Sequence, residues 1–166
     1  MKYIITESQY NTIMEEEQNV FHIPSVELFG DWDSLKKYLK KKGNPPYSIG
    51  GNLDLRDYNV KSLGNLISVG GDLNLGAISI QSLGDLTSVG GDLILAFSSR
   101  LKSLGDLTSV GGDLFINYSK VESLGDLTSV GGDLIMYNTP LSKIYSEEQI
   151  RQMIKIGGKV NLWNTL

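Results

Sequence analysis

Aspartates recur at a fixed spacing in this chain and form two columns, which are the residues best placed to do chemistry. The first column is Asp72, Asp92, Asp113 and Asp133, and the second is Asp85, Asp106 and Asp126. Stacked carboxylates could bind Ca²⁺, imitate the charges of a phosphate backbone, or accept backbone N–H groups at turns. Asn52 and Asn65 stand at the matching positions of earlier repeats. Because an amide keeps the acceptor and loses the charge, we favour the structural role and expect no metal site.

Side chains that support catalysis are scarce. His22 is the only histidine and there is no cysteine, so thiolate metal sites and disulfides are excluded. No serine lies in a Gly-x-Ser-x-Gly turn, and no glycine pair belongs to a Gly-x-x-x-x-Gly-Lys-Ser/Thr phosphate loop. We therefore expect a protein that is not an enzyme, with no cofactor and with a structural or solvent-exposed His22.

The aspartates are carried by an internal repeat. The twelve residues Ser82–Leu93 return unchanged at Ser103–Leu114 and Ser123–Leu134, and a looser copy spans Ser62–Leu73. Pairs of glycines begin at positions 50, 70, 90, 111, 131 and 157, so the period is 20 or 21 residues before one longer interval. A period in this range predicts a solenoid, in which each coil is covered by its neighbours.

Each coil spaces its apolar residues in two ways. In one coil they are Ile80, Leu83, Leu86, Val89, Leu93 and Leu95, and the other coils match this pattern. The steps of three favour a tight 3₁₀ or extended path, whereas the final step of two indicates a strand with one buried face. We predict one short strand and a compact return path per coil, with glycines at the corners in positive-φ conformations. The predicted fold is a mainly β solenoid of parallel strands with helical caps.

The frame Leu-x-x-Leu-x-x-Val-Gly-Gly-Asp-Leu-x-Leu resembles leucine-rich repeats over about residues 48–144, in particular the short bacterial and viral type with a Gly-Gly-Asp-Leu strand entry. This resemblance implies a protein-binding solenoid. The asparagine that usually follows the strand is replaced by Tyr58, Ile78, Ser98, Ser119 and Thr139. A flatter, β-helix-like solenoid is therefore the structural alternative. The opening, Met1–Gln9, resembles the start of small phage-encoded proteins, which implies an inhibitor or adaptor that acts on a host protein.

Segments with helical patterns flank the repeats. Thr6 and Gln9 form a capping box for a first helix, and Asp31 or Asp33 can begin a second helix over residues 34–42, whose lysines form a solvated face. An amphipathic helix at this place would cover the first coil, whose core edge is otherwise open.

The C-terminal segment repeats this arrangement. Ser146 and Gln149 form another capping box, for a helix that buries Ile150, Met153 and Ile154. A last glycine pair and strand follow this helix, so we interpret the segment as the second cap. The predicted divisions are an N-terminal capping segment, 1–47, the repeats, 48–144, and a C-terminal cap, 145–166.

The residues that differ between copies lie at and after the strand. Alternation places Ile94, Phe115 and Ile135 side by side on the face opposite the core. An exposed apolar and aromatic patch on a sheet is typical of a protein interface. The predicted partner-binding residues are Ile94, Phe97, Phe115, Asn117, Tyr118, Ile135, Tyr137 and Trp163. The alternatives are that the terminal helices or a second copy of the chain cover this patch.

The net charge of −4 argues against direct nucleic-acid binding through a basic face. No secretory signal and no apolar run of membrane-spanning length is found, so we expect a soluble protein of the cytoplasm, or of the host cytoplasm if phage-encoded. Our first hypothesis is a non-enzymatic solenoid that binds a protein partner through its strand face. The alternatives are an acidic mimic of nucleic acid that blocks a DNA- or RNA-handling enzyme, and a self-assembling structural protein or homo-oligomer.

Overall fold

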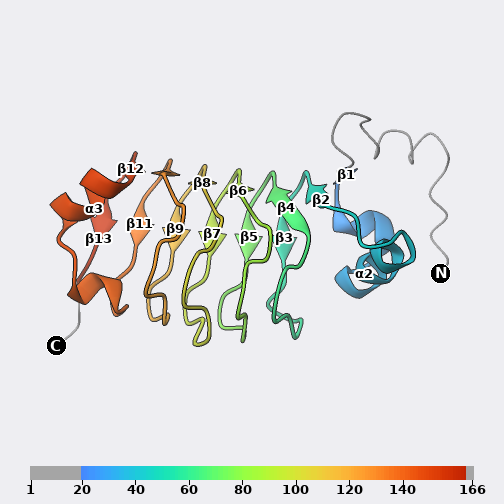
Figure 1. Cartoon of the computed structure of the whole chain (residues 1–166), viewed down its shortest axis with the longest axis horizontal. Helices are drawn as coiled ribbons and strands as arrows, with labels where there is room; N and C mark the ends of the chain where they lie inside the picture. The colour runs from blue at the N-terminus through green and yellow to red at the C-terminus, as the bar shows by residue number, and fades with distance from the viewer. Residues whose placement is uncertain (1–19, 164–166) are drawn as a thin grey trace.

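The chain forms an elongated stack of coils, seen in a computed structural model that describes residues 20–163 (Figure 1). Two sheets run along the stack, and all their neighbouring strands are parallel. This architecture confirms the predicted parallel solenoid with coils of about twenty residues.

Each repeated coil contributes one strand to each sheet. The seven strands of sheet A are, in spatial order, β1 (Phe21–Ile23), β2 (Tyr47–Ile49), β4 (Leu66–Val69), β6 (Ser88–Val89), β8 (Ser109–Val110), β10 (Ser129–Val130) and β12 (Lys155–Ile156). The six strands of sheet B are β3 (Leu53–Asp54), β5 (Leu73–Asn74), β7 (Leu93–Ile94), β9 (Leu114–Phe115), β11 (Leu134–Ile135) and β13 (Val160–Asn161). A glycine pair lies at the corner between the two strands of each coil.

The prediction of one strand and a return path per coil is wrong, because each repeated coil has a second strand, which belongs to sheet A. Its repeated strands are only two residues long, too short for an alternating pattern to be visible in the sequence. They form because identical segments stack in register, as where Ser88 pairs with Ser109 and Val89 with Val110. The return path is therefore a second sheet.

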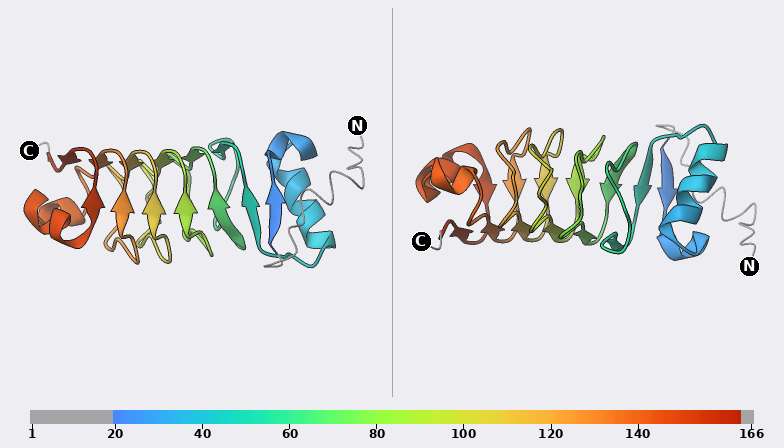
Figure 2. Two further views of the ribbon diagram at one scale, coloured as in Figure 1. Left: turned by 90° about the horizontal axis from the view of Figure 1, so that it is seen from above. Right: turned by 90° about the horizontal axis from the view of Figure 1, so that it is seen from below.

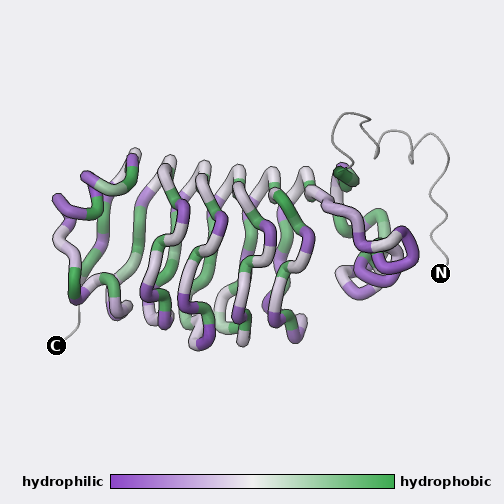
Figure 3. The backbone as a smooth tube through the Cα atoms, in the orientation of Figure 1, coloured by the Kyte–Doolittle hydropathy of each residue, from purple (hydrophilic) through white to green (hydrophobic). Residues whose placement is uncertain are grey.

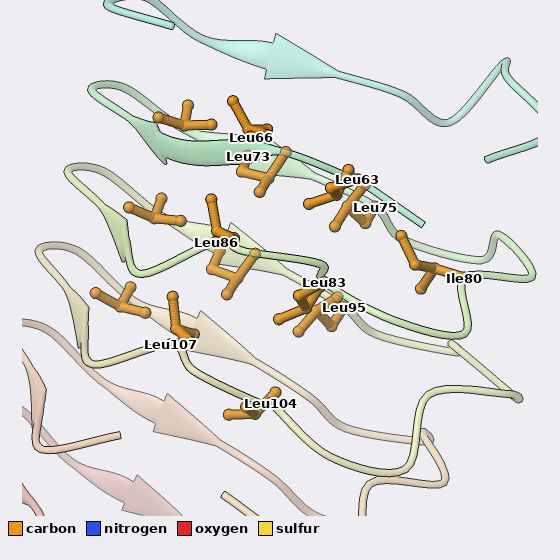
Figure 4. Packing of buried hydrophobic residues seen from close by; sticks show 14 of the residues in the cluster. Leu63, Leu66, Leu73, Leu75, Ile80, Leu83, Leu86, Leu95, Leu104 and Leu107 are labelled. Atoms are coloured by element: carbon orange, nitrogen blue, oxygen red, sulfur yellow. The ribbon is translucent and has the colours of Figure 1, made fainter. Parts of the chain in front are cut away.

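The predicted inward residues form one continuous core between the sheets. Leu66, Leu86 and Leu107 are each 0 % exposed, and Figure 4 shows such equivalent leucines one behind another in successive coils. Burial of one such side chain contributes roughly 1.5–3 kcal/mol. Because each coil fills the same space with the same side chain, the stack can continue without repacking.

The paired glycines serve a different purpose from the predicted one. The single glycines at 64, 84, 105 and 125 do have φ values of 58–61°, but none of the paired glycines has a positive φ. A Cβ atom at Gly131 would overlap the carbonyl oxygen of Gly111, and one at Gly132 would overlap Asp113 Oδ1. The pairs are therefore needed because the backbones of adjacent coils stack closely at this corner.

The residues at the turn after each sheet B strand lie inside the solenoid in the later coils. Ser98, Ser119 and Thr139 are at most 2 % exposed. Ser98 Oγ donates to Leu75 O at 3.3 Å, and Thr139 Oγ1 donates to Met136 O at 2.7 Å. These hydroxyls donate to backbone carbonyls at the turns, and they do so without an asparagine ladder. The stack of coils runs without pronounced curvature (Figure 2).

Two short helices close the N-terminal end, the 3₁₀ helix η1 (Val26–Phe29) and α2 (Trp32–Lys41). Asp31 caps α2 as predicted, and its carboxylate accepts the backbone N–H three residues on at 2.7 Å. The helix begins two residues earlier than predicted, because Trp32 joins its buried side. Its outer face is hydrophilic (Figure 3). The first predicted helix, after Thr6, lies outside the described residues.

The C-terminal cap contains the 3₁₀ helix η2 (Leu141–Lys143) and α3 (Glu147–Met153). The capping box of Ser146 and Gln149 is present, and Ile150 and Ile154 are buried as predicted. The prediction of a buried Met153 is wrong, since 52 % of this residue is exposed. The helix ends there, and the extended backbone at Ile154 turns that side chain inward instead. Neither α2 nor α3 has the length and apolarity that crossing a bilayer requires.

Arg151 on α3 closes the last edge of sheet A. Its guanidinium donates to Ile156 O at 3.3 Å and to Gly158 O at 2.8 Å. One coil earlier, the equivalent carbonyls of Val130 and Gly132 accept the N–H groups of the last glycine pair. Arg151 thus supplies the two donors that a further glycine pair would have supplied.

One interval in the stack is longer than its neighbours. Gly90 and Gly111 are 21 residues apart, whereas the next glycine pair follows after 20. A Cβ atom at Gly84 or Gly125 would overlap the backbone of the preceding coil, but the space around Gly105 is open. Close backbone stacking at this turn is therefore interrupted between the coils of Gly84 and Gly105.

Candidate functional site

Three partly exposed apolar side chains lie side by side on the outer face of sheet B. Strand pairing joins Ile94 to Phe115 and Phe115 to Ile135. We call these three residues the strand-face row. Asn74 and Asn161 continue the row on its two sides in polar form. The row is therefore three strands wide, about 10 Å across at the usual strand spacing, and it lies outside the core as predicted.

Two aromatic rings stack at the turn that follows these strands. The ring centroids of Phe97 and Tyr118 are 4.8 Å apart and their planes differ by 10°. Tyr118 also meets Tyr137 edge-on, at 5.3 Å and 86°. We call Phe97, Tyr118 and Tyr137 the aromatic ladder. Phe97 and Tyr118 remain 57 % and 41 % exposed, so much of their surface is accessible to another molecule.

The backbone is left-handed at two residues of the aromatic ladder. Phe97 and Tyr118 have φ values of 62° and 56°, and Ala77 and Asn138 occupy the same position in neighbouring coils with 59° and 55°. This conformation costs a non-glycine residue roughly 1–2 kcal/mol. Sequence reasoning missed it. The available signal was Asn138, because asparagine is enriched in left-handed positions.

Two other predicted contact residues lie apart from the exposed rings. Asn117 is only 7 % exposed, and its Nδ2 donates to the Tyr137 hydroxyl at 3.3 Å. It therefore supports the aromatic ladder instead of presenting its own surface. Trp163 is 83 % exposed and takes part in none of the ring contacts found among residues 20–163. It lies at the C-terminal edge of sheet B, where its backbone N–H donates to Asn161 Oδ1 at 3.3 Å.

A charged pair borders the site at the other end of sheet B. Arg56 Nη2 lies 2.7 Å from Asp54 Oδ2. The hydrogen bond from Arg56 holds the pKa of the Asp54 carboxyl below its ordinary value. The outer face of sheet B thus changes from charged through polar to apolar along the stack, and it is polar again at Asn161 on the last strand.

The first aspartate column forms the hydrogen-bonded ladder expected of turn residues. Asp72 Oδ1 accepts the N–H of Asp92 at 2.9 Å, and Asp92 Oδ1 accepts that of Asp113 at 2.7 Å. Asn52 begins this ladder, and Lys159 donates its N–H to the last aspartate. The column therefore joins coils.

The second aspartate column has a different environment. Asp85, Asp106 and Asp126 are exposed, and their carboxylates form no hydrogen bond within the described part of the chain. Across residues 20–163, no three His, Asp or Glu side chains come together in a way that could hold a metal ion.

The outer face of sheet A carries a shallow groove of about 550 Å³. It is lined by the serines, valines and glycines of the repeated frame, with Lys155 at one end. His22 lies beyond its other end, where Nδ1 is 2.7 Å from Ser48 Oγ. Successive coils present the same small residues here, so no side chain distinguishes one position along the groove as a site.

The strand-face row and the aromatic ladder are therefore the surface at which this chain departs most from its own repeat.

Comparisons with models of protein families, with curated proteins and with solved structures find no match to the chain.

Proposed function

We propose that this protein is a non-enzymatic binding module that takes a protein partner on the outer face of sheet B. The observation that carries the proposal is the exposed stack of Phe97 and Tyr118. Both rings stand on left-handed backbone, where the same turn in other coils has Ala77 and Asn138. Large rings at a strained and exposed position contribute little to the core, so a role in binding accounts for them better.

The strand-face row extends this surface. Ile94, Phe115 and Ile135 come from the strands that lead into the turns of the aromatic ladder, so the two groups share the same coils. Aromatic side chains with apolar neighbours are the usual anchors of protein interfaces. Binding would act by steric occlusion, because the solenoid would cover the surface of the partner that it contacts.

The resemblances of the sequence support a more specific role. The repeat resembles bacterial and viral leucine-rich repeats, and Met1–Gln9 resembles the start of phage-encoded proteins. We propose on this basis an inhibitor or adaptor that acts on a host protein in the host cytoplasm. No cofactor is needed for such a role.

Substitutions on the outer face of sheet B test the proposal. We expect Phe115→Asp and Tyr137→Asp to retain the circular dichroism spectrum of the wild type and to lose at least tenfold in partner capture from a bacterial host lysate, measured by mass spectrometry. Lys61→Glu is the control, because it adds acidic charge at an exposed position away from the site. Undiminished capture by both aspartate variants would reject this face. Light scattering across concentrations tests instead whether a second copy occupies it.

The second aspartate column supports an alternative function, the imitation of nucleic acid. Asp85, Asp106 and Asp126 are exposed, and their carboxylates form no hydrogen bond among the described residues. A mimic would bind its target with a steep dependence on salt. Loss of binding on Asp→Asn changes in this column, with no effect of Phe115→Asp, would favour the mimic over the aromatic surface.

A further inference from the structure

The two sheets end differently at the C-terminal end of the stack. Sheet A ends with β12, against which α3 packs, and Arg151 donates to the carbonyls of Ile156 in β12 and of Gly158 just after it. Sheet B ends with β13, and both views of Figure 2 place α3 on the sheet A side of this end. The edge of sheet A is thus closed, whereas α3 does not close the edge of sheet B.

The hydrogen bonds show which backbone groups of β13 face outward. Leu134 N donates to Lys159 O at 2.8 Å and Met136 N donates to Asn161 O at 3.0 Å. Alternate residues of a parallel strand direct their backbone groups to opposite sides. Val160 and Leu162 therefore direct their N–H groups away from β11, and no residue between 20 and 163 accepts them. One coil earlier, the equivalent N–H groups of Leu134 and Met136 both find acceptors.

We propose that the open edge of β13 binds an extended peptide segment of a partner protein, which adds to sheet B as one more strand. The carbonyls of this segment accept the N–H groups of Val160 and Leu162, and the segment runs in the direction that a further coil would take. Strand addition of this kind derives its affinity from backbone hydrogen bonds and its specificity from alternate side chains. This edge is a separate surface from the aromatic ladder.

The charges around the edge identify the chemistry of the segment. Residues 141–163 carry four Lys and Arg against two Glu, whereas residues 48–140 carry five Lys and Arg against ten Asp and Glu. Lys155 and Lys159 are exposed, and neither pairs with a carboxylate among the described residues. An acidic segment complements this end of an otherwise acidic protein.

Lys159 and Trp163 indicate where the acidic and apolar residues of the bound segment would lie. Lys159 occupies the position that aspartates hold in the first column, as its N–H bond to Asp133 Oδ1 at 2.7 Å shows. An acidic residue of the added strand would lie beside it, about 5 Å away at strand spacing. Trp163, which is 83 % exposed, can cover an apolar residue farther along the segment. The bound segment therefore has an acidic residue near its N-terminal end and an apolar residue farther toward its C-terminal end.

A second copy of the chain is a poorer occupant than a peptide. At the N-terminal end, η1 residues Val26 and Glu27 line a small cavity together with Leu53 and Asp54 of β3. The N-terminal cap therefore lies beside the opposite edge of sheet B, where it would obstruct a second copy that paired head to tail.

A peptide titration followed by the NMR amide signals of the full chain tests the proposal. The probe is an acetylated and amidated Asp-Leu-Phe-Ile-Asn, the sequence of residues 113–117. We expect saturable shifts concentrated at residues 159–163. Leu162→Pro removes one outward N–H and no inward bond, and should weaken binding at least tenfold. A probe with Lys in place of Asp should bind at least threefold more weakly.

A second variant decides the matter if Leu162→Pro does not fold. Lys159→Glu keeps every backbone group and should reverse the preference, so that the lysine probe binds more tightly than the aspartate probe. Shifts spread over other strands, or equal affinity of the wild type and folded Leu162→Pro, would overturn the proposal. A wild-type dimer that Leu162→Pro abolishes would also overturn it, because a second copy would then occupy the edge. Phe115→Asp should leave the titration unchanged.

Discussion

The two sheets share one core and one period, yet their outer faces differ in kind. The outer face of sheet A repeats the same serines and glycines in successive coils. The outer face of sheet B changes from Asn74 to Ile94 and Phe115 in successive strands. The difference indicates where the chain is constrained by its own stacking and where it is available to other molecules.

Backbone contact explains the constraint. At the corner that follows sheet A, the Cβ position of each later paired glycine is already occupied by the preceding coil, either by a carbonyl oxygen or by an aspartate Oδ1. No other residue fits there without moving a neighbour. An outward residue of sheet B meets only the equivalent side chains of the adjacent strands, so its identity can vary at little cost to the stack.

Gly131→Ala is the strongest test of this contrast. The added Cβ would overlap the Gly111 carbonyl oxygen, which is backbone and cannot move without its whole coil. We expect a loss of about 3 kcal/mol in the free energy of unfolding, measured by urea denaturation. Gly76→Ala is the matched control on the sheet B side, because its Cβ would meet side-chain atoms of Asn74 and Ile94 at 3.3 and 3.4 Å. Equal losses of stability in both variants would contradict the proposed difference in constraint between the two sheets.

Asp113→Ala tests the hydrogen-bonded ladder at the same corner. The change leaves the N–H of Asp133 without the acceptor that it contacts at 2.7 Å in a partly buried position. We expect a loss of about 1–2 kcal/mol in the free energy of unfolding. Asp113→Asn keeps an acceptor, as Asn52 does at the start of the ladder, and should lose less than half as much. A similar loss for both would mean that the charge matters more than the acceptor.

Arg151→Ala compares the two sheet edges. Loss of the guanidinium leaves two carbonyls at the edge of sheet A without their donors. We expect a destabilisation of about 1 kcal/mol, reduced for solvent screening, and faster hydrogen exchange in β12 than in β13. Arg151→Lys should recover only part of the protection, because an ammonium cannot reproduce the two-pronged geometry. Faster exchange spread evenly over all coils would argue against a local cap.

Phe97→Asn should have the smallest effect on stability. Asparagine tolerates the left-handed backbone that Phe97 occupies at φ 62°, and this gain offsets the lost stacking on Tyr118, which is worth roughly 0.5–1.5 kcal/mol. The melting temperature should therefore stay nearly unchanged while partner capture falls. A large drop in melting temperature would instead mean that the Phe97 ring stabilises the fold.

The inward leucines could be predicted because their spacing has only one geometric solution. Leu93 and Leu95 are two residues apart, which is a strand with one buried face, and both are 0 % exposed. The hydrogen-bonding role of the first aspartate column could be predicted from Asn52, which keeps the acceptor without the charge. The same prediction for the second column was wrong, because its carboxylates accept no backbone N–H among the described residues. The proposed binding residues were placed outward by the same alternation, and Ile94, Phe115 and Ile135 do lie on that face.

Other features depend on neighbours that a single coil does not reveal. The paired glycines could be read as turn residues, since the carbonyl that excludes a Cβ comes from another coil. Asn117 could be placed outward by alternation, but its bond to Tyr137 from the next coil draws it inward. Met153 fitted the helical stripe, yet the helix stops at that residue. In each case an inter-coil contact or the end of a helix overrode the local pattern.

The open space at Gly105 has a mechanical consequence. Coils that contact only their neighbours transmit load in series, and the turn contacts are interrupted between the coils of Gly84 and Gly105. This junction divides the array into two blocks of more closely stacked coils. Stretched between its ends in an optical trap, the protein would separate there first and lengthen in two steps.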